Sequence, residues 1–264
     1  MDVQGKTVLL TGASTGLGPH IARRLRRGGA KFVLSARNEE ALNKLAADLG
    51  DSRVVVADLS RSGEAERLAE QAGPIDVLVS NAGIPASGRL ITFTVDELDR
   101  AIAVNVRAGI VLARLLLPGM LERRSGHMVF LSSIAGRIAG PGFGVYSATK
   151  FAVRGFALAL RAELWGTGVG VSVIYPTFVK ESGMWAETGL KPNPIAGEVT
   201  PAQVAEAVFS AVRRNRGEVN VMPLQLRATI KFQDVAPGLF GTIARATGAS
   251  AVEDVVGERQ RNKR

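Results

Sequence analysis

The stretch "YSATK" places Tyr146 four residues before Lys150. On a helix, residues four apart lie on one face, so a phenol and an ammonium would be neighbours. A free tyrosine has a pKa of about 10 and a free lysine one of about 10.4, so neither exchanges protons well at neutral pH. A nearby cation stabilises phenolate and lowers the tyrosine pKa. The pair therefore predicts a group that transfers protons. The alternative is that the two residues are neighbours by chance on an amphipathic helix.

A second chemical pattern is the glycine-rich stretch "TGASTGLG", residues 11–18, which lies between an apolar run and a helical pattern. Gly12 would permit a tight turn, and Gly16 would remove a side chain where a phosphate must approach. Gly18 would let the helix pack closely on the strand. Free N–H groups at the start of that helix suit a pyrophosphate. The stretch predicts a dinucleotide-binding loop, although a glycine-rich turn alone is a weak signal.

The elements that must position these residues follow from the apolar pattern. Seven short apolar, β-branched runs alternate with helical patterns near 17–28, 39–49, 61–72, 95–124, 147–165 and 201–215. The runs are "KTVLLTG", "AKFVLSAR", "SRVVVADL", "IDVLVSNAG", "HMVFLSS", "VGVSVIYP" and "EVNVMP". Asn38 and Thr200, each before residues suited to a first turn, predict helix starts. The alternation predicts a doubly wound α/β domain: a Rossmann-type parallel sheet of about seven strands with helices on both faces.

Polar or small residues end six consecutive strands of this sheet. They are the glycine loop, Arg37, Asp58, Asn81-Ala82-Gly83, Ser132-Ser133 and Tyr175-Pro176-Thr177. Ligands of open α/β sheets bind beyond the carboxyl ends of the strands, where the strand order reverses. We therefore expect one site at this edge of the sheet.

Composition narrows the class of protein. The 264 residues are 46% apolar, enough for one large core, and contain no cysteine. We expect one domain, residues 1–223, followed by an extension, 224–264, that does not fold independently. No thiol chemistry and no metal site are expected, and the absence of an obvious export signal predicts a cytoplasmic protein. The net charge of +9 permits anionic partners, but the basic runs lack interleaved aromatic residues, so nucleic acid is not expected.

Taken with "NAG" and "YSATK", the glycine loop resembles that of the short-chain dehydrogenase/reductase family, over about residues 5–223. The resemblance implies that Tyr146 is the acid and base and that Lys150 tunes it and binds the nicotinamide ribose. Ser133, thirteen residues before the tyrosine, would hold the substrate oxygen. Asn105 would complete a proton path through water and ribose. The alternative for Asn105 is a structural bond to a backbone carbonyl.

The same resemblance implies a set of contacts to the dinucleotide. These residues are Gly12, Ser14, Thr15, Gly16, Leu17, Gly18, Asp58, Leu59, Asn81, Ala82, Gly83, Tyr146, Lys150, Pro176 and Val179. Within this set, Asp58 and Leu59 would flank the adenine. For Asp58 the alternative is a polar strand terminus.

Arg37 bears on the choice of cofactor. An acidic residue at the end of the second strand would bind the ribose 2′-OH of NAD, whereas an arginine accommodates a 2′-phosphate. Ala36 holds the acidic position here and Arg37 follows it. We predict NADP(H), with NAD(H) as the alternative if Arg37 only pairs with Glu39 or Glu40.

The chain departs from the family pattern after the sixth strand, where it has "PTFVKES". Thr177 stands where the family usually has glycine. Glu181 stands where it usually has threonine, and Ser182 follows Glu181. Because threonine lacks the conformational freedom of glycine, we expect an altered backbone and altered nicotinamide contacts here.

The long connection 178–200 predicts a lid over the substrate. Its apolar residues Phe178, Met184, Trp185, Leu190 and Ile195, with Ile138 and Phe143 near the tyrosine, suggest a bulky lipid-, steroid- or long-chain-like substrate. A satellite hydrophobic cluster is the alternative.

The sequence also bears on partners. The tail 224–247 mixes apolar and basic residues and could cover the lid, build an oligomer contact or rest on an anionic membrane surface. The helices near 95–124 and 147–165 are apolar on more than one stripe, which predicts a homo-oligomer, either a dimer or a tetramer.

The function expected from these patterns is an NADP(H)-dependent oxidoreductase that interconverts a carbonyl and an alcohol. Tyr146 would exchange the proton, and Ser133 would hold the oxygen. The alternative is a dinucleotide-binding regulator or scaffold that has the fold but turns nothing over.

Overall fold

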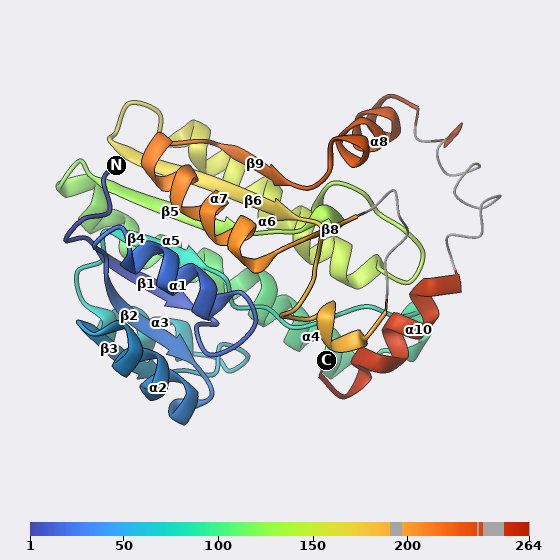
Figure 1. Ribbon diagram of the computed structural model, residues 1–264, viewed down its shortest axis with the longest axis horizontal. Helices are drawn as coiled ribbons and strands as arrows, with labels where there is room; N and C mark the ends of the chain where they lie inside the picture. The colour runs from blue at the N-terminus through green and yellow to red at the C-terminus, as the bar shows by residue number, and fades with distance from the viewer. Residues whose placement is uncertain (191–196, 237, 240–250, 264) are drawn as a thin grey trace.

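The computed structural model describes residues 1–190, 197–236, 238–239 and 251–263. Its centre is a seven-stranded, wholly parallel sheet in the order β3-β2-β1-β4-β5-β6-β9 (Figure 1). The strands are β1 (Thr7–Thr11), β2 (Lys31–Ala36), β3 (Ser52–Val56), β4 (Val77–Ser80), β5 (Gly126–Leu131), β6 (Val169–Pro176) and β9 (Glu218–Val221). The strand order reverses between β1 and β4. The predicted doubly wound fold is confirmed.

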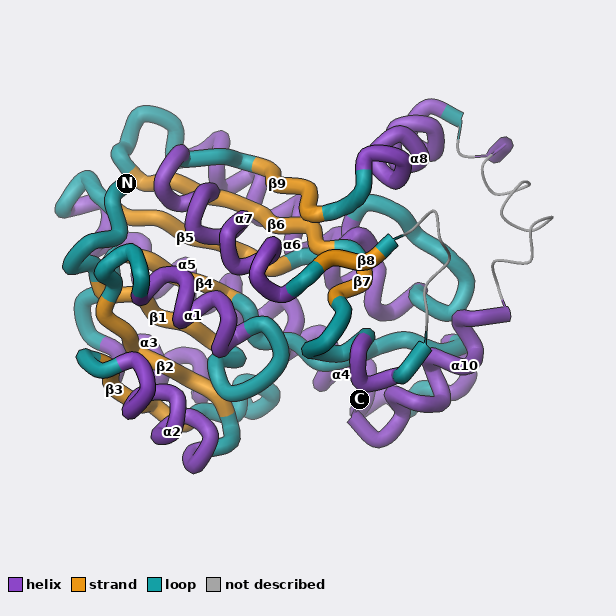
Figure 2. The backbone as a smooth tube through the Cα atoms, in the orientation of Figure 1, coloured by secondary structure: helices purple, strands orange, loops and turns teal. Residues whose placement is uncertain are grey.

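Helices cover both faces of the sheet (Figure 2). On one face, α1 (Gly18–Arg26), α2 (Glu39–Leu49) and α7 (Pro201–Arg214) enclose one hydrophobic cluster with the strands. On the other, α3 (Glu64–Ala72), α5 (Ala108–Glu122) and α6 (Gly144–Glu163) enclose a second. Since both faces are buried, the strands carry near-continuous apolar runs.

Side-chain caps fix where two of these helices begin, as predicted. The Asn38 side chain accepts a bond from the N–H of Ala41 at 2.9 Å, and α2 follows. Thr200 and Gln203 form a reciprocal capping box with Pro201 at the start of α7. Such caps satisfy N–H groups that have no partner within the helix.

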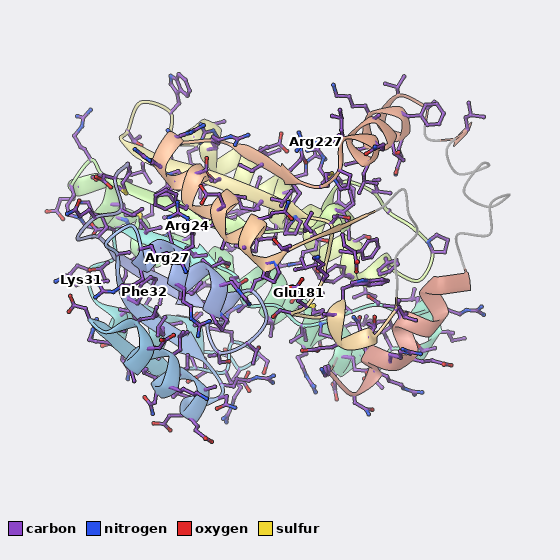
Figure 3. The ribbon with its side chains drawn as sticks, viewed as in Figure 1. Arg24, Arg27, Lys31, Phe32, Glu181 and Arg227 are labelled. Carbon is purple, nitrogen blue, oxygen red and sulfur yellow. The ribbon has the colours of Figure 1, made fainter. Side chains whose placement is uncertain are left out.

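Helices α1 and α7 are held together by a cation–aromatic contact as well as by apolar packing. The guanidinium of Arg24 lies 3.4 Å from the centre of the Phe209 ring and pairs with Glu206 at 2.5 Å (Figure 3). A cation over an aromatic face is attracted by the negative charge of the ring face. The contact fixes α7 against the helix that follows the glycine loop.

The predicted helix 95–124 is interrupted. It consists of α4 (Val95–Ile102), a π-helical turn η2 (Ala103–Arg107) and α5. By length and composition, Val95–Glu122 could cross a membrane. However, Leu112 and Met120 are buried against the sheet, the pattern of a helix that covers a core. A π-turn inside an α-helix often marks a functional position, and Asn105 lies within it.

The remaining elements gather beyond the carboxyl edge of the sheet (Figure 1). They are η1 (Leu90–Thr92), η3 (Ile134–Gly136), β7 (Phe178–Val179), η4 (Ala186–Thr188), β8 (Glu198–Val199), α8 (Leu224–Val235), α10 (Ala251–Gln260) and η5 (Arg261–Lys263). The short strands β7 and β8 pair at the base of the predicted lid.

The end of the chain covers the lid. Arg259 donates to the carbonyl of Thr188, Lys263 pairs with Glu187, and the Gln260 amide donates to the carbonyl of Met184 at 3.0 Å. Lid coverage is one of the roles expected for the extension, and in the described part of the chain residues 259–263 make these contacts. Ile195 and residues 240–247 of the sequence predictions lie outside the described residues.

One buried histidine predicts how stability depends on pH. His127 Nε2 lies 2.8 Å from the Ser172 hydroxyl, which itself donates to the carbonyl of Arg216, and burial lowers the pKa of His127 to about 3. The unfolded chain therefore binds the proton more readily below pH 6.5, and stability falls as pH falls from there toward 3. By linkage the loss is about 2 kcal/mol between about pH 7 and pH 5.

Denaturant unfolding of the wild type and of His127→Gln, which keeps a donor but does not titrate, measures this loss. We expect the variant to lose about 2 kcal/mol less over the same interval. Equal pH dependence in the two proteins would mean that His127 is not responsible.

Candidate active site

A cavity of about 740 Å³ opens at the carboxyl edge of the sheet. The predicted site residues that line it are Gly12, Thr15, Gly16, Leu17, Arg37, Asn81, Ala82, Gly83, Ser133, Tyr146, Lys150, Pro176 and Val179. Ser14, Gly18, Asp58, Leu59 and Asn105 are not part of its wall. Thus one cavity brings together the glycine loop, the strand ends and the Tyr-Lys helix.

The glycine loop has the backbone that its sequence predicts. Gly12 has φ +62°, and a Cβ there would lie 2.8 Å from the Cα of Ala82. A Cβ on Gly18 would lie 2.3 Å from the carbonyl oxygen of Gly12, so only glycine permits this packing of α1. Gly16 has φ +60° and leaves the wall of the cavity free of side-chain atoms. A bare backbone at the start of a helix fits the pyrophosphate of a dinucleotide.

Thr11 organises this loop, and sequence analysis missed it. Its hydroxyl accepts bonds from the N–H groups of both Asn81 and Ala82, each at 3.1 Å. The Asn81 amide donates in return to the carbonyls of Thr11 and Gly12. These bonds join the ends of β1 and β4 at the point where the strand order reverses. A polar residue that ends a buried strand was the signal available, since it requires a partner.

Two residues of the predicted adenosine end differ in what they contact. Arg37 is exposed at the cavity and pairs with neither Glu39 nor Glu40 in the described part of the chain. The Asp58 carboxylate instead accepts bonds from the N–H and hydroxyl of Ser60, at 3.1 and 2.7 Å. Asp58 therefore has the contacts of a polar strand terminus, and its part in adenine binding stays a prediction.

The proposed acid lies between a strand end and its own helix. Tyr146 and Lys150 are on α6, with the ammonium 5.6 Å from the centre of the tyrosine ring. The Ser133 hydroxyl, at the end of β5, hydrogen-bonds the tyrosine side chain. The neighbouring Ser132 instead donates to the carbonyl of Lys150 at 2.9 Å. The serine, tyrosine and lysine thus meet in the same cavity.

The protonation of this group corrects one expectation. We expected the ammonium to lower the tyrosine pKa, but burial raises the pKa of Tyr146 to about 12, opposed only by the bond with Ser133. Burial lowers the pKa of Lys150 to about 8. Removal from water disfavours the charged form of each group, and at this separation the ammonium does not compensate. The protein's own groups therefore hold the tyrosine as a protonated phenol.

The Lys150 ammonium has more hydrogen-bond donors than it uses within the described part of the protein. Its ammonium is buried and donates to the carbonyl of Leu131 at 3.0 Å. An ammonium carries three donors, so with the bonds of the described residues counted, two remain for ligand hydroxyls in the cavity. This donor set fits the ribose of a nicotinamide nucleotide.

Asn105 is buried and its side chain is fully engaged. It accepts a bond from the N–H of Ile84 at 2.8 Å and donates to the carbonyl of the same residue at 3.0 Å. Its amide also reaches Thr149 at 3.4 Å, whose hydroxyl donates to the carbonyl of Tyr146. A structural bond to a backbone carbonyl was the alternative role for Asn105, and these bonds are of that kind. They hold the segment that follows β4, at Ile84, to α6, the helix that carries Tyr146. A role for Asn105 in a proton path stays a prediction.

The departure from the family pattern strains a different residue from the one expected. Thr177 has an ordinary negative φ, is buried and donates its N–H to the carbonyl of Val221 at 3.1 Å. The positive φ falls on Glu181, at +68°, a conformation that non-glycine side chains rarely adopt. Glu181 lies near the start of the lid segment 178–200 (Figure 3) and pairs with Lys180. The positive φ therefore lies four residues after Thr177, which holds the position of the family's glycine.

This turn brings the lid onto the glycine loop. Ser182 donates to the carbonyl of Gly16 at 2.9 Å, and a Cβ on Gly16 would lie 3.5 Å from the Cα of Gly183. Ser182 and Gly183 both line the cavity. Ser182 was named in the sequence only as a neighbour of Glu181, so this contact was not foreseen.

Comparison with known proteins agrees with this geometry. A family model for short chain dehydrogenase matches residues 6–193. Ketoacyl reductase HetN of Nostoc sp. is 40% identical over 225 residues, which cover 82% of this chain and 78% of that protein. Dehydrogenase/reductase SDR family member 7B of Bos taurus is 32% identical, covering 90% of this chain and 80% of its own.

A solved structure shows the same architecture. The short-chain dehydrogenase from Sphingobium yanoikuyae in complex with NADPH superposes with a TM-score of 0.78 at 28% identity, covering 89% of this chain and 95% of its own. The chain belongs to the short-chain dehydrogenase/reductase family, and it is an oxidoreductase of the class that acts on alcohols and carbonyls.

Proposed function

We propose that the protein uses NADPH to reduce a carbonyl group on an apolar, ketoacyl-type substrate. The observation that carries the proposal is the meeting of Ser133, Tyr146 and Lys150 in a cavity that the glycine loop and Arg37 also line. Binding and acid chemistry thereby share one enclosed space.

The chain's own groups have distinct tasks in this reaction. A bound NADPH would supply the hydride, which is the chemistry the protein itself lacks. Ser133 orients the substrate oxygen through its hydroxyl, and Tyr146 gives that oxygen its proton. Lys150 binds ribose hydroxyls and provides positive charge that favours the phenolate left behind.

The cavity wall supports an apolar substrate. On the lid side it is formed by Phe178, Met184 and Trp185, and the extension adds Leu226 and Val256. The rings of Phe178 and Trp185 pack 4.2 Å apart between centres. A ketoacyl reductase is among the similar proteins, and an acyl chain of this type suits such a wall.

A panel of ketoacyl thioesters, apolar ketones and aldehydes tests the proposal by the loss of NADPH absorbance. We expect turnover of ketoacyl compounds that improves with chain length up to the capacity of the cavity. NADPH binding without turnover of any panel member would favour the dinucleotide-binding regulator instead.

Arg37 predicts the cofactor preference. Because it is exposed at the cavity and unpaired with its acidic neighbours, its guanidinium is available to a 2′-phosphate. Arg37→Ala is expected to weaken NADPH binding about 10- to 100-fold and to leave NADH binding within about twofold. Fluorescence titration with both nucleotides measures this, with Arg27→Ala, a basic residue outside the cavity, as the control. An unchanged preference would remove Arg37 from recognition.

We also propose that the protein is a homo-oligomer. Ile102, Leu115 and Phe151 on α4, α5 and α6 are large apolar side chains that remain 38–52% exposed. Exposed apolar groups on neighbouring helices are typical of a contact with another copy. Analytical ultracentrifugation should find a dimer or tetramer, and a monomer at micromolar concentration would contradict the proposal.

A further inference from the structure

Among the described residues that line the cavity, two carry a buried polar atom without a hydrogen-bond partner. These atoms are the indole N–H of Trp185, on the lid, and the amide oxygen of Gln260, on α10. Both residues line the cavity, and they are only 9% and 7% exposed. One atom is a donor and the other an acceptor, and they are not bonded to each other.

The orientation of the Gln260 amide is fixed by its other end. Its nitrogen donates to the carbonyl of Met184 at 3.0 Å. Reversing the amide would set its oxygen against that carbonyl, two acceptors facing each other. The oxygen is therefore the atom left without a partner.

Packing likewise fixes the Trp185 ring. It lies against Phe178, with 4.2 Å between ring centres, in the apolar part of the wall. Since Met184 precedes Trp185 directly, the bond from Gln260 joins the two elements that carry the unpartnered atoms. Arg259 and Lys263 bind the same lid segment and hold α10 in place.

An unpartnered polar group in an apolar environment has lost its bonds to water and gained none in return. Two such groups of opposite kind on adjoining elements of a ligand cavity are complementary to a ligand that both donates and accepts. A secondary amide or a hydroxyl does both, whereas an ester or ketone only accepts and an alkyl chain does neither.

We propose that Trp185 and Gln260 form a second polar subsite, separate from the Ser133–Tyr146 pair, for an amide or hydroxyl group on the substrate. The inference rests on the proposed function in taking this cavity as the substrate site. It refines the substrate class to an apolar carbonyl compound with one uncharged group that donates and accepts. The extension then contributes to specificity as well as to the lid.

The test measures binding without turnover, so that failure of the reaction and failure of the subsite are distinguishable. The protein is the full chain carrying Tyr146→Phe, saturated with NADPH, and the method is calorimetry. The ligands are linear chains of equal length with a secondary amide, a hydroxyl or an ester at successive positions. At one position or more we expect the amide or the hydroxyl to bind at least about tenfold more tightly than the ester. The two series distinguish an amide from a hydroxyl.

Variants then locate the preference. Gln260→Met should bring the preferred ligand to within about twofold of its ester, while Gln225→Met, an exposed glutamine on α8, should change nothing. Trp185→Phe keeps an aromatic ring and should reduce the preference several-fold. The affinity of each variant for NADPH shows whether that variant is folded. If Gln260→Met no longer binds NADPH, the result for Trp185→Phe decides whether the subsite exists. No preference at any position, or a preference that survives the deciding variant, overturns the subsite.

Discussion

Replacing Tyr146 with phenylalanine should lower kcat by about a thousandfold or more and leave NADPH affinity within about twofold. The phenol lies in the cavity beside the Ser133 hydroxyl, and burial holds it protonated by raising its pKa to about 12. Phenylalanine keeps the ring and removes only the hydroxyl group, and with it the proton. Stopped-flow measurement of NADPH oxidation, alongside a binding titration, separates the two effects.

The chain offers a matched control, because it has only one other tyrosine. Tyr175 is buried on β6, bonds Glu218 at 2.7 Å and does not line the cavity. Tyr175→Phe should leave kcat/KM within about threefold of the wild type. Turnover retained by Tyr146→Phe would remove that residue from the role of acid.

Replacing Lys150 with methionine should impair both NADPH binding and turnover. In the described part of the chain its ammonium makes one hydrogen bond, to the carbonyl of Leu131, and it has two further donors. We expect about a tenfold or greater loss of NADPH affinity together with about a thousandfold loss of kcat/KM. The combined loss distinguishes Lys150 from Tyr146, whose replacement should affect turnover alone.

A lysine outside the cavity wall serves as the control for this change. Lys180 lies in the lid segment 178–200, its side chain is 46% exposed, and it pairs with Glu181. Lys180→Met should keep both NADPH affinity and kcat/KM. If Lys150→Met binds NADPH as the wild type does, the lysine does not bind the ribose, and its effect on turnover acts through the tyrosine alone.

The sheet and the glycine loop could be predicted because each depends on local rules that the sequence displays. Buried parallel strands must be continuously apolar, and caps such as Asn38 and Thr200 mark helix starts. Gly12 and Gly18 are required by contacts with Ala82 and with the loop itself, which the strand–turn–helix pattern implies. The spacing from Tyr146 to Lys150 follows directly from the helix repeat.

The features of the site that could not be predicted depend on contacts between residues distant in sequence. The bonds of Asn105 to Ile84, 21 residues away, and of Ser182 to Gly16, 166 residues away, have no local signal. The pKa of Tyr146 depends on burial, which spacing alone does not determine. The strain at Glu181 rather than at Thr177 depends on where the chain leaves the sheet.

The most direct test of the central claim is an ultraviolet titration of the tyrosines with and without NADP⁺. Tyr175 does not interfere, because burial and its bond to Glu218 raise its pKa far above the usual range. With NADP⁺ bound, the phenolate band of Tyr146 should appear below about pH 9, and it should be missing in Tyr146→Phe and shifted upward in Lys150→Met. If no phenolate forms below about pH 10 with NADP⁺ bound, cation-assisted proton transfer by Tyr146 is contradicted.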